Sequence, residues 1–183
     1  RALGTLPRSK VTVLADRVEI EAISESIEQR ATFIAALERR MPRGVEVVLD
    51  ISAPRPVITP FAFRAVHDGN GLRLETCTAD SAEAANRIRL ALEAAGIRRL
   101  ITCPVGLGAP TPSWSDAVTS GLEALRMLEM GGTLSISDAD VTLVAAQDTP
   151  QDVFDTAMGR LQNTLPPLFS LQGVLPEPSN RTD

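Results

Sequence analysis

The chain has 183 residues, a formal net charge of −5 and 44% hydrophobic residues. This length is enough for one large domain or two small ones, and the hydrophobic content excludes wholesale disorder. The acidic surplus argues against nucleic-acid binding, because phosphate contacts require a basic surface. No apolar run approaches the roughly 20 residues that a membrane-spanning helix needs. Because the sequence begins with Arg1 and ends in a short polar stretch, we expect a piece excised from a longer protein.

Three segments of the chain repeat one pattern. In each, two strands of alternating apolar and polar residues form a hairpin, a capped helix follows, and a further strand ends the segment. We therefore predict an α+β fold of three ββαβ units, the last with a leading helix, whose small sheets are covered by helices in two packed lobes. The predicted divisions are a tail (1–10), three units (11–56, 57–110 and 111–176) and a C-terminal tail (177–183).

In the first unit, the alternation predicts a hairpin over residues 11–22 that turns at Ala15 and Asp16. Ser26 followed by Gln29 is typical of a helix start, because the Ser side chain caps free N–H groups. The predicted apolar stripe of this helix consists of Ile27, Ala31, Ile34, Leu37 and Met41. The helix is predicted to end at Pro42-Arg43-Gly44, and a strand over residues 45–51 follows.

In the second unit, the alternation predicts a hairpin over 61–77 that turns between Asp68 and Gly71. Asp and Gly suit such turns, since they tolerate unusual backbone angles or bond their own backbone. Asp80 followed by Glu83 indicates a helix start. The predicted apolar stripe of this helix consists of Ala85, Ile88, Leu92 and Ala95. The helix is predicted to end at Gly96, and a strand over residues 98–103 follows.

In the third unit, a leading helix is predicted from Ser113 to about Met130. The hairpin after it spans 133–146 and turns at Asp138 to Asp140. Thr149 is the predicted cap of the next helix, with Pro150 at the first helical position before Asp152. The predicted apolar stripe of this helix consists of Phe154, Ala157, Leu161 and Leu165. The helix is predicted to end at Pro166-Pro167, and a strand over residues 168–175 follows.

Two proline-rich linkers, 53–60 and 104–112, divide the units. They either separate subdomains or punctuate one continuous layer, and we expect the first two units in one lobe and the third in another. The Gly-x-Gly of residues 105–113 resembles a phosphate-binding loop only superficially, because Thr111 replaces the third glycine and prolines remove N–H donors. We interpret it as a linker that enters a helix.

No catalytic, cofactor-binding or metal site is predicted, and we do not expect an enzyme. The single histidine, His67, lies near a predicted turn, where an exposed polar role is expected. Asp138 and Asp140 lie two apart, as in a calcium loop, but the Gly and the distal Glu of such a loop are missing. The single Trp, Trp114, either anchors the leading helix in the core or stacks on a ligand or partner.

The two cysteines, Cys77 and Cys103, are 26 positions apart and both end predicted strands of the second unit. A pair without His-rich neighbours suits a disulfide bond better than a metal site. Two buried free thiols are the alternative, because Cys is commonly a core residue.

The segment 113–175 resembles the BON domain, a small module of bacterial envelope and osmotic-stress proteins. A larger part of the chain, from ISAPRPVITPFAFRAVHDGNG through VGLGAPTPSW and SDADVTLVA to FSLQGVLP, is similar to the periplasmic region of OmpA-family proteins of alphaproteobacteria. BON domains usually carry a Gly shortly after the second strand, where this chain has Ala22, Thr76 and Ala145.

The resemblance implies a non-enzymatic periplasmic spacer and interaction region, associated with the outer membrane. It implies contact with envelope proteins or a lipid surface, and it favours the Cys77–Cys103 disulfide, since the periplasm is oxidising. Peptidoglycan would be bound only through a domain that these residues do not contain. The alternative is a module that binds a small ligand or phospholipid in a cleft between lobes near Trp114.

Overall fold

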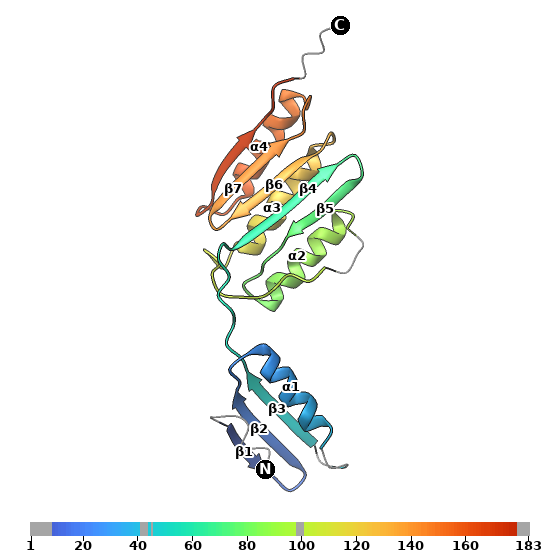
Figure 1. The fold of residues 1–183 in the computed structure, drawn as a ribbon. Coiled ribbons are helices and arrows are strands. Elements are labelled where there is room, and N and C mark those ends of the chain that lie inside the picture. The colour runs from blue at the N-terminus through green and yellow to red at the C-terminus, as the bar shows by residue number, and fades with distance from the viewer. Residues whose placement is uncertain (1–8, 41–43, 45, 98–100, 179–183) are drawn as a thin grey trace. The chain divides into compact units, whose positions relative to one another are not determined.

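The computed structural model describes residues 9–40, 44, 46–97 and 101–178 (Figure 1). The fold is α+β, as predicted, with two separate sheets. The chain divides into two compact parts, here called the first domain (Arg1–Arg55) and the second domain (Pro56–Asp183). This division lies next to the boundary that the linker composition predicts.

The first domain has a three-stranded sheet with the order β1-β2-β3 and one helix, α1. The hairpin strands are antiparallel and β2 is parallel to β3, as in the predicted ββαβ unit. The elements are β1 (Ser9–Val13), β2 (Arg17–Ile23), α1 (Ile27–Glu38) and β3 (Glu46–Ser52).

The second domain has a five-stranded sheet with the order β5-β4-β6-β7-β8. All neighbours are antiparallel except β7 and β8. The strands are β4 (Ala62–Asp68), β5 (Gly71–Thr76), β6 (Gly132–Ser137), β7 (Asp140–Ala145) and β8 (Ser170–Val174). The helices are α2 (Ala82–Ala94), α3 (Trp114–Met127) and α4 (Gln151–Thr164).

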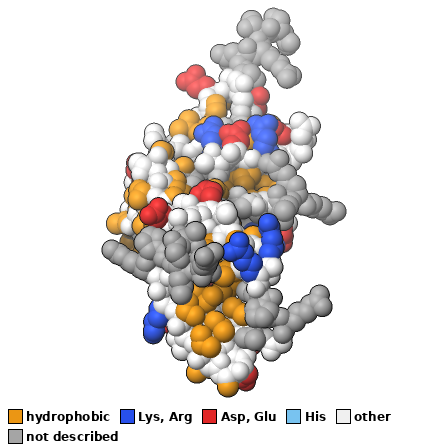
Figure 2. Space-filling model, turned by 60° about the horizontal axis from the view of Figure 1, so that its bottom comes forward, with side chains coloured by type: hydrophobic (Ala, Val, Ile, Leu, Met, Phe, Trp, Pro, Cys, Tyr) orange, Lys and Arg blue, Asp and Glu red, His pale blue; other side chains and the backbone are white. Residues whose placement is uncertain are grey.

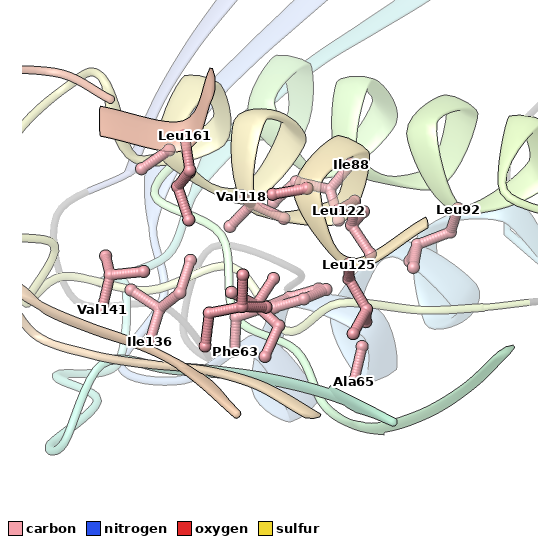
Figure 3. Packing of buried hydrophobic residues seen from close by; sticks show 14 of the residues in the cluster. Phe63, Ala65, Ile88, Leu92, Val118, Leu122, Leu125, Ile136, Val141 and Leu161 are labelled. Carbon is pink, nitrogen blue, oxygen red and sulfur yellow. The ribbon is translucent and has the colours of Figure 1, made fainter. Parts of the chain in front are cut away.

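The core of the second domain lies between this sheet and its three helices. Figure 3 shows helix residues such as Leu122 and Leu125 pointing at strand residues such as Phe63 and Ile136, all of them buried. Helix α3 packs against both α2 and α4 and against β4 and β6. It therefore covers the line where the second and third units join.

The three predicted hairpins are confirmed. Their last paired residues are Val13 with Val18, Asp68 with Gly71, and Ser137 with Asp140. The φ angle of Asp138 is 51°, a left-handed value that Asp tolerates better than most residues. Local turn chemistry therefore places all three reversals correctly.

The helix starts agree with the prediction in one case and differ in two. The Ser26 hydroxyl accepts a hydrogen bond from the Gln29 N–H at 3.0 Å, as predicted. In α2 the cap is Ser81, not Asp80, and its hydroxyl accepts from the Ala84 N–H. In α4, Pro150 precedes the helix in an extended conformation, so its predicted place inside the first turn is wrong.

The first helix packs differently from the prediction. Ile27 and Ala31 of the predicted stripe are exposed, and Met41 lies outside the described residues. Ile34 and Leu37 of the predicted stripe do pack against Ala22 and Ile51, together with Phe33, which the prediction left out. The second half of the predicted stripe is thus confirmed, whereas its first two residues do not reach the sheet.

The expected grouping of the units is wrong. Strand β4 of the second unit pairs with β6 of the third in one continuous sheet, whereas the first unit forms a sheet of its own. The predicted strand 98–103 is not seen in the part of it that the structure describes. Residues 98–100 lie outside the described residues, and 101–103 have no regular structure.

Candidate functional site

Cys77 and Cys103 form a disulfide bond, with their Cα atoms 5.0 Å apart. The sequence reasoning had left free thiols open, and the structure decides for the bond. Both residues are nearly buried. Closing a loop of 26 positions stabilises a domain by about 3–4 kcal/mol in the chain-entropy model.

The disulfide bond holds the segment that returns after α2 beside the end of β5. Two residues beyond each cysteine, Ala79 and Val105 form a parallel bridge with the same spacing of 26 positions. The Ala79 N–H donates to the Pro104 carbonyl and the Gly106 N–H to the Ala79 carbonyl, each at 2.9 Å. In the other two units, the strand after the helix pairs in parallel with the second strand of the hairpin. In the described part of the second unit, the disulfide bond and one parallel bridge take the place of such a strand.

Trp114 anchors the core, which was one of its two predicted roles. Its side chain is fully buried, in edge-to-face contact with Phe61 at a centroid distance of 4.7 Å. Its indole N–H donates to the Thr78 carbonyl at 2.9 Å. With no exposed surface, Trp114 offers no platform for a ligand, and ligand binding elsewhere on the chain stays a prediction.

Thr78 is a structural residue that sequence reasoning missed. Its hydroxyl donates to the Ala62 carbonyl at 2.8 Å and accepts from the Ala62 N–H at 3.1 Å. The side chain therefore supplies the pairing that an extra residue of β5 would give to the start of β4. Only the position next to Cys77 could have indicated this role, and that signal is weak.

The two proline-rich linkers lie side by side. Ile58 and Leu107 join them through a hydrogen bond of 2.8 Å from the Ile58 N–H to the Leu107 carbonyl. At Gly106, an added Cβ would lie 2.6 Å from the Pro56 carbonyl oxygen and from Ile58 Cδ1. The glycines of the 105–113 segment therefore allow close packing of backbone, in agreement with the linker interpretation.

His67 and the turn acids have structural contacts. His67 is in β4 and half-buried, and its Nδ1 lies 3.1 Å from the Leu128 carbonyl at the end of α3, so the expected exposed role is wrong. An Asp138 carboxylate oxygen accepts from the Phe61 N–H at 3.0 Å. Among the described residues, no three His, Cys, Asp or Glu side chains gather in a group that could hold a metal ion.

The end of β1 carries exposed apolar side chains that are suited to bind a partner. The sheet face that α1 covers carries Val11 and Val13 on β1, yet α1 packs over β2 and β3. Val13 is 71% exposed and the adjacent Leu14 is 53% exposed. Hydrophobic side chains gather on the first domain in the lower part of Figure 2.

Among the described residues, β1 has a strand neighbour on one side only, which is β2. Val13 at the end of β1 and the adjacent Leu14 are thus exposed apolar residues beside a strand with one described neighbour, and such a surface favours contact with a partner. The sequence reasoning did not identify this surface, because strand order cannot be read from the sequence of one chain. The alternation of β1 was visible, but not which strand would lie beside it.

No family model matches the sequence, and no curated protein is significantly similar to it. Within the described residues, no helix is both long and apolar enough to cross a lipid bilayer.

Proposed function

We propose that this chain is a non-enzymatic spacer and interaction region of an OmpA-family envelope protein in the bacterial periplasm. In this proposal, the region precedes a peptidoglycan-binding domain that lies outside these residues. Its units place that domain at a distance from the outer membrane and offer a surface to envelope partners.

The disulfide bond between Cys77 and Cys103 is the observation that carries the proposal. Stable disulfide bonds form in exported proteins and are rare in the reducing cytosol. In the second domain this bond holds the segment after α2 beside the end of β5, so an oxidising compartment adds to the stability of the fold. A periplasmic location supplies that condition.

The contacts of the most reactive residue types agree with a scaffold. Both cysteines are consumed by the disulfide bond, and His67 lies against a backbone carbonyl. The exposed apolar side chains of Val13 and Leu14 support the interaction part of the proposal, since exposed apolar patches often mark sites of protein contact.

The proposal is tested by locating the full-length gene product in its own bacterium. We expect it in the outer-membrane fraction, with Cys77 and Cys103 labelled by a maleimide reagent only after reduction. A variant with Cys77→Ser and Cys103→Ser is the control, because it lacks the thiols that the reagent labels. A cytosolic product whose two thiols react without reduction would overturn the proposal.

A second measurement tests the division of labour between this chain and the neighbouring domain. The chain of residues 1–183 is mixed with purified peptidoglycan sacculi and sedimented. We expect it to remain in the supernatant, while the full-length protein sediments with the sacculi. Sedimentation of the short chain would show that the spacer assignment is wrong.

A further inference from the structure

Strand β8, coloured red in Figure 1, forms one edge of the five-stranded sheet, and β7 is its only strand neighbour among the described residues. The Ser170 N–H donates to the Ala139 carbonyl at 2.9 Å, so the backbone groups of Ser170 point toward β7. Because successive residues of a strand direct these groups to opposite sides, those of Leu171 and Gly173 point outward. In the part of the chain that the structure describes, these outward groups have no hydrogen-bond partner.

The sequence of β8 lacks the usual protection against pairing. Exposed edge strands commonly carry charges, prolines or bulges that discourage another strand from adding. Strand β8 has no charged residue, and none occurs anywhere from Leu165 to Pro176. The other edge strands of the two sheets carry Lys10 in β1, Glu46 and Asp50 in β3, and Arg73 and Glu75 in β5. The edge of β8 is therefore the one whose composition suits a further strand.

The residues along this edge are complementary to themselves in an antiparallel arrangement. Leu171, Gly173 and Leu175 alternate along it and read the same in both directions, as Leu-x-Gly-x-Leu. A two-fold axis at Gly173 places this glycine opposite its own copy, and it places Leu171 opposite Leu175 of the second copy. We propose that a second copy of this chain pairs with β8 in this register, so that the two five-stranded sheets become one.

This register uses all the outward backbone groups of the edge. Facing residues in a hydrogen-bonded antiparallel pair exchange two hydrogen bonds, and Leu171, Gly173 and Leu175 form three such pairs with the second copy. By the same alternation, Pro176 is at a position that faces β7, so its missing N–H does not interrupt the outer edge. The pairing therefore satisfies donors and acceptors that otherwise bond only to water.

On the face of the sheet that the helices cover, the pairing meets a hollow. Its lining includes Met158 of α4, Leu165 at the end of α4, and Leu171. Gly173 lets α4 approach β8 closely, since an added Cβ would lie 2.6 Å from the Met158 Cε atom. In the dimer, Leu175 of the second copy lies beside Leu171 at this hollow, and the symmetry repeats the contact. Facing side chains on one sheet face are close enough to pack.

The opposite face brings no like charges together. Gln172 is exposed and Val174 is 38% exposed, and the register places each of them opposite the other in the second copy. Glu177, the first charged residue after β8, falls opposite Phe169. Two copies of a chain with a net charge of −5 can thus meet at this edge without repulsion between the paired strands.

Sedimentation equilibrium of residues 1–183 over a range of concentrations tests the proposal, with a chain mass of 19.5 kDa. We expect a reversible monomer–dimer equilibrium. Gln172→Lys combined with Val174→Lys places two lysines opposite each other at two positions, which should raise the dimer dissociation constant by about tenfold. Gln172→Lys combined with Val174→Glu is the matched control. It places opposite charges across from each other, and its dissociation constant should stay within about threefold of the wild-type value.

Cross-linking provides a second readout of the same register. Facing residues that do not exchange hydrogen bonds have Cα atoms about 4.5 Å apart, whereas diagonal neighbours are about 7–8 Å apart. A mixture of Gln172→Cys and Val174→Cys chains should therefore give a covalent dimer on mild oxidation, whereas each variant alone should give little. Cys77 and Cys103 are already bonded to each other and do not compete.

Far-ultraviolet circular dichroism of every variant should match that of the wild type, since both substituted side chains lie on the exposed face. A wild-type chain that is monomeric at all concentrations would overturn the proposal. A dimer that the two charge variants weaken equally, or that neither of them changes, would also overturn it. Equal cross-linking in the mixture and in each variant alone would show that β8 does not pair in this register.

Discussion

Gly106 and Gly159 lie in opposite surroundings. An added Cβ at Gly106 meets backbone and side-chain atoms at 2.6 Å, whereas one at Gly159 meets nothing within 4 Å. Gly159 is in the interior of α4, where glycine costs about 0.5–1 kcal/mol relative to alanine. The same residue type is thus required at one position and a source of instability at the other.

We expect Gly106→Ala and Gly159→Ala to change stability in opposite directions. The first should lower the free energy of unfolding of the second domain by about 1–3 kcal/mol, because the two linkers must move apart. The second should raise it by about 0.5–1 kcal/mol. Urea denaturation followed by the fluorescence of Trp114 measures both. Equal effects of the two substitutions would contradict the packing role of Gly106.

The hydrogen bonds of single residues explain two errors of the sequence reasoning. His67 was expected to be exposed because its neighbours form a turn, but its ring meets the carbonyl of Leu128, which is 61 positions away. Thr78 was missed for the same reason, since its hydroxyl bonds to Ala62 and its carbonyl to Trp114. Such contacts join distant parts of the chain, so neighbouring residues give no signal of them.

At the scale of elements, local signals predicted the structure well. The three hairpins and the ends of α2 and α4 follow from turn and stop residues that act within a few positions. Gly96 ends α2 with a φ of 101°, and the Ile97 N–H donates to the Leu92 carbonyl behind it. This is the arrangement that an αL glycine gives to a helix end.

Contacts between elements could not be predicted in the same way. The pairing of β4 with β6 joins residues about 70 positions apart, and similar alternating strands elsewhere in the chain carry the same pattern. Since every hairpin here has an alternating first strand, only the structure shows which of them pair with each other.

The return segment of the second unit gives a prediction at this scale. We expect Cys77→Ser combined with Cys103→Ser to lower the free energy of unfolding of the second domain by about 3 kcal/mol. Hydrogen exchange should accelerate most at Ala79 and Gly106, whose N–H groups form the remaining bridge. The wild-type chain under oxidising conditions is the control. Unchanged protection of these two amides would show that the bridge persists without the disulfide bond.

At the scale of the whole molecule, the two domains have very different cores. In the first domain the buried apolar residues Ala22 and Ile51 are joined by partly buried neighbours, whereas the second has an extensive buried cluster between sheet and helices. Because burial of apolar surface is the main stabilising contribution, the first domain should be the less stable one.

Thermal unfolding should therefore show two transitions. Circular dichroism should report both, while the fluorescence of Trp114, which is in the second domain, should report only the one at higher temperature. A single transition seen identically by both methods would contradict this independence.

The covalent closure of the second unit also affects how the chain responds to tension. When the chain is pulled from its two ends, the residues between Cys77 and Cys103 are shielded from that pull by the bond. With 26 positions excluded, the second domain would lengthen by about 90 Å less when forced open, at about 3.5 Å per extended residue. Helix α2 lies inside the shielded loop, so it could remain coiled while the rest of the sheet is drawn out.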